Sequence, residues 1–192
     1  LGALSPTFSV LVATQTIGRP LGIALSVFVI VFATEEMGNN TRAWALSVLA
    51  VASDDHACKS STLPHQSEHM FIGASVPVLA PANVQEVLDL GIFGWELSRY
   101  SGCWVGLKAI TENMDSAISA DIDSDRIDII IPEDFELPPD GVHARWPDKP
   151  MEQELRLNKY KIYAAREFAR VNRLNKVVRD SDNARFGIIT SG

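Results

Sequence analysis

Two short, almost unbroken apolar runs constrain the fold of this 192-residue chain more than any other feature. They are Trp44–Ala52 and Cys103–Ile110. Runs of this length match strands that are buried on both faces, as in parallel sheets. A helical pattern of apolar residues lies between them. This order predicts an α/β chain whose parallel sheet is connected by right-handed crossovers.

The segment between the two runs predicts a short strand and then a helix. The strand is Val76–Leu79. Asn83 has the character of an N-cap, and Glu86, three residues later, completes a capping box. Apolar residues then recur at helical spacing until Gly91 and Gly94, where we expect the helix to break before the pattern resumes.

An apolar run near the N-terminus allows several interpretations. Leu21–Ala33 is interrupted only by Gly22 and Ser26, and Thr34 and two glutamates follow it. A membrane span needs about 20 apolar residues, which is more than this run provides. A secretory signal is compatible with Arg19 before the run. We favour a strand or helix that is buried in an α/β domain.

The second half of the chain predicts an acidic loop at Asp121–Asp128, a proline-rich connector and a long helix. Lysine and arginine fill the second half of that helix, where they complement the helix dipole. The expected elements are a strand at Ile127–Ile131, an extended connector at Glu133–Pro150, a helix at Met151–Leu174, and strands at Val177–Val178 and Phe186–Thr190, the last of them buried.

Composition excludes some classes of function. The net charge of −7 argues against nucleic-acid binding, which needs clustered cations. Cys58 and Cys103 are the only cysteines, and we interpret them as reduced cytosolic thiols. Two cysteines cannot hold an iron–sulfur cluster, which takes about four thiolates.

The densest group of polar side chains is Asp54–His69, which follows the first apolar run. Open α/β sheets place ligand sites just beyond the carboxyl ends of their strands. A zinc hydrolase is one interpretation, because His65, Glu68 and His69 fit the H-x-x-E-H pattern. Both histidines would bind zinc from one helical face, and Glu68 would act as the base. Pro64, directly before the motif, would let such a helix begin only at the first ligand.

Three other interpretations of this group stay open. Cys58 beside His56 or His65 would make a thiolate nucleophile. The hydroxyls, Gln66 and Glu68 would bind a cofactor or a facing subunit. A polar loop that only caps the next helix, as in a non-catalytic α/β interaction module, is the interpretation that the residues alone favour.

The same stretch resembles a loop of a known enzyme family. Asp54–Glu68 reads D-D-H-A-C-K-S-S-T-L-P-H-Q-S-E. It is similar to the loop of the long, fused bacterial indolepyruvate ferredoxin oxidoreductases. More distant 2-oxoacid:ferredoxin oxidoreductases carry D-D-P…S-S-Q-N-E in their pyrimidine-binding thiamine domain. The resemblance covers roughly residues 48–192 and continues through Pro77–Pro81, Val84–Gly91, Gly94–Gly106, Pro132–Pro139, Arg145–Asp148, Glu152–Glu154 and Ala184–Ile188.

The resemblance implies a thiamine-diphosphate-dependent oxidative decarboxylation of an aryl pyruvate. Family members pass the electrons through iron–sulfur clusters to ferredoxin and give the acyl group to coenzyme A. The full-length enzyme would hold thiamine diphosphate, Mg²⁺ and [4Fe-4S] clusters, none of them completed by this chain alone. We expect a cytoplasmic homo-oligomer that binds a second thiamine domain of the same enzyme, and neither nucleic acid nor a membrane.

Site residues are carried over one by one. His69 stands where the family has an aromatic residue, which makes the zinc motif of His65 and His69 a coincidence under this interpretation. The glutamate that activates the aminopyrimidine lies further upstream in the family and has no counterpart here. Cofactor-proximal roles fall to Asp55, Ser60, Ser61, Gln66 and Glu68.

The expected domain organisation follows the extent of the resemblance. Residues 1–47 form an atypical apolar segment that differs from the family. Residues 48–122 form the C-terminal part of a pyrimidine-binding thiamine domain. Residues 123–150 are the connector, and residues 151–192 start a following α/β domain. We expect both ends to be cut points of a longer protein, and the isolated chain to be inactive.

Overall fold

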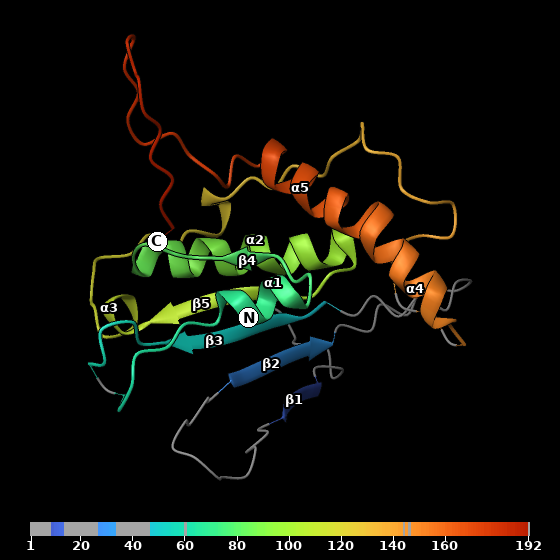
Figure 1. The fold of residues 1–192 in the computed structure, drawn as a ribbon, viewed down its shortest axis with the longest axis horizontal. Coiled ribbons are helices and arrows are strands. Elements are labelled where there is room, and N and C mark those ends of the chain that lie inside the picture. The colour runs from blue at the N-terminus through green and yellow to red at the C-terminus, as the bar shows by residue number, and fades with distance from the viewer. Residues whose placement is uncertain are drawn as a thin grey trace.

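The computed structural model describes residues 9–13, 27–33, 47–59, 61–143, 145 and 147–191, with the backbone alone in the first two segments. They contain a sheet with strand order β1-β2-β3-β5-β4 (Figure 1). Strands β3, β5 and β4 are parallel, and β1 and β2 extend the sheet in antiparallel fashion. The predicted α/β class is confirmed. The strands are β1 (Ser9–Ala13), β2 (Val27–Ala33), β3 (Leu49–Asp54), β4 (Val78–Leu79) and β5 (Val105–Ile110).

The three parallel strands correspond to the predicted apolar segments. Strand β3 begins and ends later than the run Trp44–Ala52 and includes Asp54 as its last residue. Strand β4 is only the second half of the predicted strand, and β5 lies within Cys103–Ile110. In the register of β3 and β5, Leu49 lies beside Val105 and Ala52 beside Lys108. Side chains two residues apart share a face, so each strand presents one set to each side.

Helix α2 (Val84–Ser101) covers one face of the sheet (Figure 1). It begins as predicted, because the Asn83 side chain accepts a hydrogen bond from the backbone N–H of Glu86 at 3.0 Å. The Glu86 carboxylate in turn accepts one from the N–H of Ala82 at 2.9 Å. It ends at Gly102, whose φ of 69° is the left-handed conformation of a helix C-cap.

The expected break at Gly91 and Gly94 is wrong, because α2 runs through both glycines. Gly94 is where the helix approaches the sheet most closely. A Cβ atom there would lie 2.8 Å from Leu49 Cδ1 and 2.9 Å from Leu79 Cδ1. This glycine therefore permits close packing of helix on sheet.

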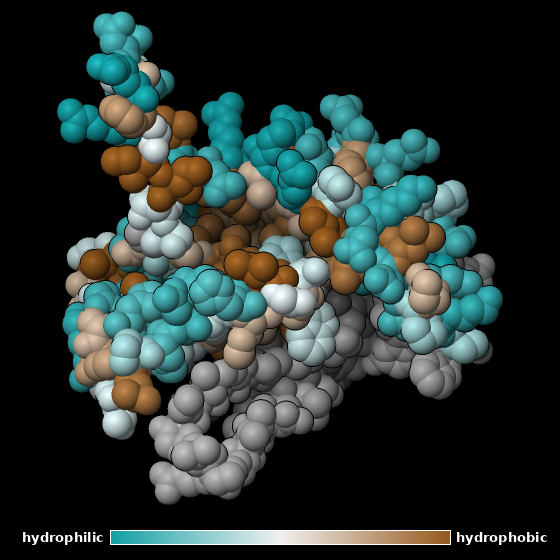
Figure 2. Space-filling view, viewed as in Figure 1, coloured by the Kyte–Doolittle hydropathy of each residue, from teal (hydrophilic) through white to brown (hydrophobic). Residues whose placement is uncertain are grey.

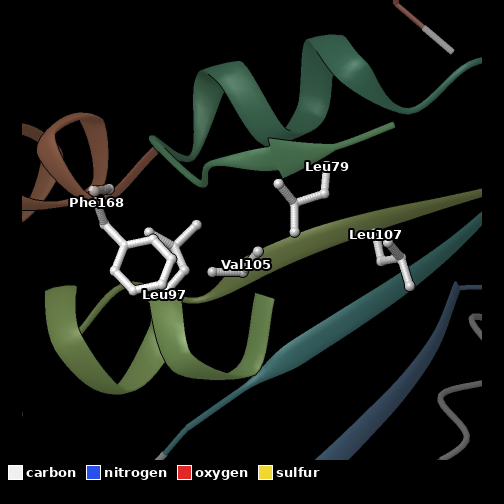
Figure 3. Close-up of a cluster of buried hydrophobic side chains, with 6 residues drawn as sticks. Leu79, Leu97, Val105, Leu107 and Phe168 are labelled. Carbon is white, nitrogen blue, oxygen red and sulfur yellow. The ribbon is translucent and has the colours of Figure 1, made fainter. Parts of the chain in front are cut away.

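The apolar core lies between the sheet and two helices. It joins β4, β5 and α2 to Phe168 of α5 (Ile162–Val171), and Figure 3 shows the side chains meeting between these elements. The Phe168 ring packs against Tyr100, with ring centroids 5.9 Å apart. The buried members are Leu79, Leu97, Val105, Leu107, Ala165 and Phe168.

The predicted helix at Met151–Leu174 is confirmed as one helical stretch. It comprises α4 (Pro150–Arg156), a π-helical turn (Leu157–Lys161) and α5. Because α5 supplies Phe168 to the core of the parallel sheet, this helix packs with residues 48–122. The division of the chain into domains stays a prediction.

Helix α1 (Glu68–Gly73) covers the opposite face of the sheet. A Cβ atom on Gly106 would lie 3.1 Å from the Phe71 ring of this helix. Gly106 alternates with Val105 and Leu107, whose side chains point toward α2. Lys108 therefore faces the α1 side, which decides the geometry of the candidate site.

The acidic loop contains a 3₁₀ turn (Ser124–Arg126) and leads into no strand. The expected strand at Ile127–Ile131 is wrong. Instead, the side-chain amide of Asn172 makes two 2.8 Å hydrogen bonds with the backbone N–H and carbonyl of Ile130. These are the backbone groups that a neighbouring strand would otherwise pair with.

The described residues of the connector at 133–150 contain bends and a turn, in which the N–H of Gly141 donates to the Pro138 carbonyl at 2.8 Å, and Pro150 is already the first residue of α4. Val142 of the connector is buried against Gly102.

The expected strands at Val177–Val178 and Phe186–Thr190 are also wrong. Neither segment is in a strand, and their large apolar side chains are exposed, including Ile188 at 92%. Figure 2 shows apolar residues on the segment that projects from the body of the molecule.

The N-terminal apolar run is partly described. Its second half forms β2, in agreement with a strand, whereas residues 21–26 lie outside the described residues. Within the described part of the chain, no helix is long and apolar enough to cross a membrane.

Candidate functional site

A cavity of about 460 Å³ opens at the carboxyl ends of the three parallel strands. Side chains that follow β3, β4 and β5 converge on it. Cavities at this edge of an α/β sheet are the usual ligand sites of such folds. Its lining consists of His56, Pro64, His65, Gln66, Glu68, Ala80, Pro81, Lys108, Ile110 and Ser191.

Lys108 is the centre of the polar side of the cavity. Its ammonium group lies 3.4 Å from Asp54 Oδ2 and 3.4 Å from His56 Nε2, and it donates a hydrogen bond to Glu68 Oε1. The side chains of Lys108 and Asp54 are only 5% and 3% exposed. A buried ammonium group is stable in such a place only when carboxylates compensate its charge.

The register of the sheet explains why Lys108 and Asp54 meet. Ala52 of β3 lies beside Lys108 of β5, and Asp54 is two residues further along β3. Both side chains therefore project from the α1 face of the sheet. Asp54 Oδ2 also accepts two hydrogen bonds from Ser67, one from the backbone N–H at 3.1 Å and one from the side-chain hydroxyl at 3.0 Å. This contact fixes the start of α1, and the next residue, Glu68, reaches Lys108.

Glu68 has one satisfied and one unsatisfied oxygen. Its Oε1 accepts from Lys108, whereas Oε2 is buried and has no hydrogen-bond partner among the described residues. Burial raises the pKa of this carboxyl group, but the hydrogen bond and charge of Lys108 outweigh burial and hold the pKa below its usual value. Glu68 is therefore an ionised acceptor whose second oxygen is buried without a donor among the described residues.

Asp55 organises its own loop and does not line the cavity. Its carboxylate accepts hydrogen bonds from the backbone N–H groups of Lys59 and Ser61, each at 2.8 Å. Its N–H donates to Nδ1 of His65 at 3.1 Å, and its carbonyl accepts from the His65 N–H at 3.3 Å. This pairing turns the loop back, so that Gln66 and Glu68 follow at the cavity.

The predicted cofactor-binding residues therefore separate into groups. Gln66 and Glu68 line the cavity, whereas Asp55 and Ser61 hold the loop behind it. Ser60 lies outside the described residues.

The geometry does not favour the zinc interpretation of His65 and His69. Helix α1 begins at Glu68, so His65 precedes it and the two histidines do not share a helical face. His69 is exposed and does not line the cavity. The described residues contain another group with metal-binding spacing, in which ligand atoms of Asp54, His56 and Glu68 lie within 4.8 Å of one another. Lys108 contacts all three of these residues and so supplies the positive charge at this place.

The geometry also does not support Cys58 as a thiolate nucleophile of this site. Cys58 lies in the turn after β3 with a φ of 53°, and it does not line the cavity.

The sequence-based prediction missed Lys108 and the apolar wall of the cavity. A signal for Lys108 was available, because it is the single charged residue in the run Cys103–Ile110. Ile110 and Pro81 are harder to find, because a tertiary contact positions them. The Asn113 side chain accepts from the Ile110 N–H at 3.1 Å and donates to the Pro81 carbonyl at 2.9 Å. This buried amide ties the ends of β5 and β4 together.

Comparisons with protein-family models, with curated proteins and with solved structures find no match to this chain.

Proposed function

We propose that this chain is part of a thiamine-diphosphate-dependent 2-oxoacid:ferredoxin oxidoreductase of the indolepyruvate type. The cavity at the carboxyl ends of β3, β4 and β5 would be its side of the thiamine site. The observation that carries the proposal is the position of the loop with the family resemblance. Its residues Gln66 and Glu68 line that cavity, beside Lys108.

The residues of the cavity fit one part of the cofactor. Ala80, Pro81 and Ile110 form an apolar wall suited to a flat heterocycle, and Glu68 Oε2 lacks a donor. An amino group on a pyrimidine ring would supply that donor and remove the penalty of about 1–3 kcal/mol for a buried, unsatisfied acceptor.

The same residues do not fit the diphosphate group. Asp54 and Glu68 carry two negative charges, and the positive charge of Lys108 is already shared between them. Phosphate oxygens would be repelled here, so we assign the diphosphate and its Mg²⁺ to the second thiamine domain of the same enzyme. Cys58 and Cys103 are too few for a [4Fe-4S] cluster, which we also place elsewhere.

The chain's own residues would bind and orient the ring. Thiamine diphosphate, when bound, supplies the carbanion chemistry that releases CO₂ from the 2-oxoacid. Lys108 keeps Glu68 ionised, and the Asp54–Ser67 contacts hold Glu68 at the cavity. Ferredoxin and coenzyme A would act on other parts of the enzyme.

A ligand series tests the proposal in the full-length enzyme. Oxythiamine diphosphate carries an oxygen in place of the ring amino group, so it cannot donate to Glu68 Oε2. We expect thiamine diphosphate to bind at least about fivefold more tightly than this analogue, because an unpaired buried acceptor costs about 1–3 kcal/mol. Glu68→Gln should remove most of this preference and lower indolepyruvate-dependent ferredoxin reduction.

His69→Ala is the matched control, because His69 adjoins Glu68 but is exposed and outside the cavity. It should leave binding and turnover unchanged. If Glu68→Gln folds normally by circular dichroism and retains both the preference and the activity, the site assignment is wrong.

Metal analysis separates this proposal from the zinc hydrolase. The ammonium group of Lys108 already contacts Asp54, His56 and Glu68, where a metal ion would have to bind, so we expect no stoichiometric zinc in the purified chain. One equivalent of zinc that is lost in His65→Ala would favour the hydrolase instead.

A further inference from the structure

His65 lines the cavity, and contacts with one neighbour hold its ring in a fixed orientation. It forms an isolated antiparallel bridge with Asp55, the residue after β3. The backbone N–H of His65 donates to the Asp55 carbonyl at 3.3 Å, and the N–H of Asp55 donates to Nδ1 of the His65 ring at 3.1 Å. Both the backbone and the side chain of His65 are thus tied to Asp55.

Asp55 is itself firmly placed. It is buried, and it directly follows Asp54, the last residue of β3. Its carboxylate accepts hydrogen bonds from the backbone N–H groups of Lys59 and Ser61, each at 2.8 Å. A side chain that is anchored to such a residue before a ligand arrives loses little conformational freedom when it binds.

The contact with Asp55 also determines which nitrogen of the His65 ring carries the proton. A nitrogen that accepts a hydrogen bond from an N–H group has no proton of its own, so Nδ1 is unprotonated. The proton of the neutral ring is therefore on Nε2, which makes Nε2 a donor. Within the described part of the chain, no acceptor pairs with this Nε2–H.

The other donors of the cavity are less suited to orient a ligand. The ammonium group of Lys108 is already shared among three neighbouring side chains. The His56 side chain is 42% exposed. Gln66 and Ser191 are exposed too, and their amide and hydroxyl groups can rotate. The Nε2–H of His65 is therefore the donor whose direction is best defined.

His65 and Glu68 together define one kind of ligand. Glu68 presents a buried acceptor, Oε2, that has no donor among the described residues, and His65 presents a donor. Ala80, Pro81 and Ile110 add an apolar wall. Ligand sites commonly combine such a wall with a few fixed polar groups. This set fits a flat ring with an amino group and an unprotonated ring nitrogen, as in an aminopyrimidine.

We propose that His65 is a specificity-determining residue of this cavity, and that its Nε2–H donates a hydrogen bond to a ring nitrogen of the bound pyrimidine. The inference rests on the proposed function, because it takes the aminopyrimidine of thiamine diphosphate as the bound ring. It adds a contact that the family resemblance does not assign. Asp55 then acts through His65, as the residue that fixes its orientation and its proton.

Two analogues of thiamine diphosphate test this contact in the full-length enzyme. In each, one ring nitrogen of the pyrimidine is replaced by C–H, which removes an acceptor and keeps the amino group. With the native His65, one of the two analogues should bind about fivefold more weakly than thiamine diphosphate, which is the effect of one lost hydrogen bond.

Substitutions of His65 separate its contact with the ligand from its contact with the loop. In His65→Asn the side-chain carbonyl can still accept from the Asp55 N–H, but no N–H group reaches the position of Nε2. In His65→Gln the amide nitrogen reaches that position. We expect the preference to vanish in His65→Asn and to persist in His65→Gln. His69→Asn is the matched control and should keep the preference, because His69 is exposed and outside the cavity.

The position of the proton can be measured without a ligand or a variant. Nitrogen-15 NMR of the purified chain should place the proton of neutral His65 on Nε2, and a proton on Nδ1 would overturn the inference. A preference that persists in His65→Asn, or that neither analogue shows with the native residue, would overturn it as well. Failure of thiamine diphosphate to bind would refute the proposed function and this inference with it, whereas normal binding without the preference refutes the inference alone.

Discussion

Strand β5 and residues 186–190 are both short apolar runs that end in polar residues, yet they occupy opposite environments. Val105, Leu107 and Ala109 of β5 are 0%, 6% and 8% exposed, whereas Phe186 and Ile189 are 86% and 101% exposed. Strand β5 lies between β3 and β4 and is covered by α1 and α2. The C-terminal run has no such neighbours among the described residues.

The difference shows that an apolar run predicts a segment that can be buried. The run does not determine which other elements will bury it. Burial of an apolar side chain stabilises a fold by about 1.5–3 kcal/mol, but only where other elements exclude water. In β5 this gain is realised, and it is large enough to hold Lys108 in the same strand. In residues 186–190 this gain is not realised, because the large apolar side chains of the segment are exposed.

The largest expected effect on stability separates two phenylalanines, one from each kind of environment. Phe168 is fully buried in the core, and Phe186 is exposed. Phe168→Ala should lower the free energy of unfolding by about 3–5 kcal/mol through the cavity that it leaves. Phe186→Ala should change it by less than about 0.5 kcal/mol. Urea unfolding of the purified chain measures both, and equal effects would show that the tail belongs to this core.

A substitution of Lys108 tests whether this polar residue of β5 contributes to stability, as the apolar residues of the strand do. Lys108→Met removes the ammonium group and leaves Asp54 and Glu68 facing each other. We expect a loss of about 3 kcal/mol, as for other buried ion pairs deprived of one partner. Lys59→Met is the control, because Lys59 is 51% exposed and its contact with Glu112 is a surface pair. It should have little effect by urea unfolding.

A pair of glycines in α2 sharpens the contrast between packed and open positions. Gly94→Ala should destabilise the chain by about 1–3 kcal/mol, because its Cβ would meet Leu49 and Leu79 below 3 Å. Gly91→Ala meets nothing within 4 Å and should stabilise α2 by up to about 1 kcal/mol. Thermal unfolding followed by circular dichroism should give shifts of opposite sign. A common sign would contradict the close approach of α2 to the sheet.

The smallest effect is a dependence of stability on pH. The pKa of Glu68 is lowered in the folded chain, because Lys108 outweighs the opposing effect of burial. A lowered pKa means that ionised Glu68 contributes its full stabilisation above the pKa of the unfolded chain, and that this contribution is lost as the pH falls through the lower pKa of the folded chain. Glu68→Gln should flatten this acid limb in urea unfolding measured at a series of pH values. An unchanged limb would mean that Lys108 does not stabilise the ionised form.

Much of the local structure could be predicted because its causes are local. The start of α2 follows from Asn83 and Glu86, which satisfy backbone N–H groups a few residues away. Strand β5 follows from its unbroken apolar run. The failed break at Gly91 and Gly94 has a tertiary cause, since the sheet accepts the helix only where Gly94 has no side chain.

The candidate site could be predicted only in part. The loop after β3 and its Gln66 and Glu68 were found from polar clustering and from the family resemblance. Lys108 lies 40 residues after Glu68, and the strand register brings the two together. Asp55 has the right residue type for a ligand, but its carboxylate is used by Lys59 and Ser61 N–H groups of its own loop.

The sequence by itself determined the α/β class, the cap of α2, the long C-terminal helix and the polar loop after β3, because short-range periodicity and capping fix these features. Tertiary structure decided which face each strand presents, which residues share the cavity, and that residues 186–190 stay uncovered. The physical reason is that burial and charge compensation depend on neighbours distant in the sequence. Lys108 has its partners within this fold, whereas Ile188 does not.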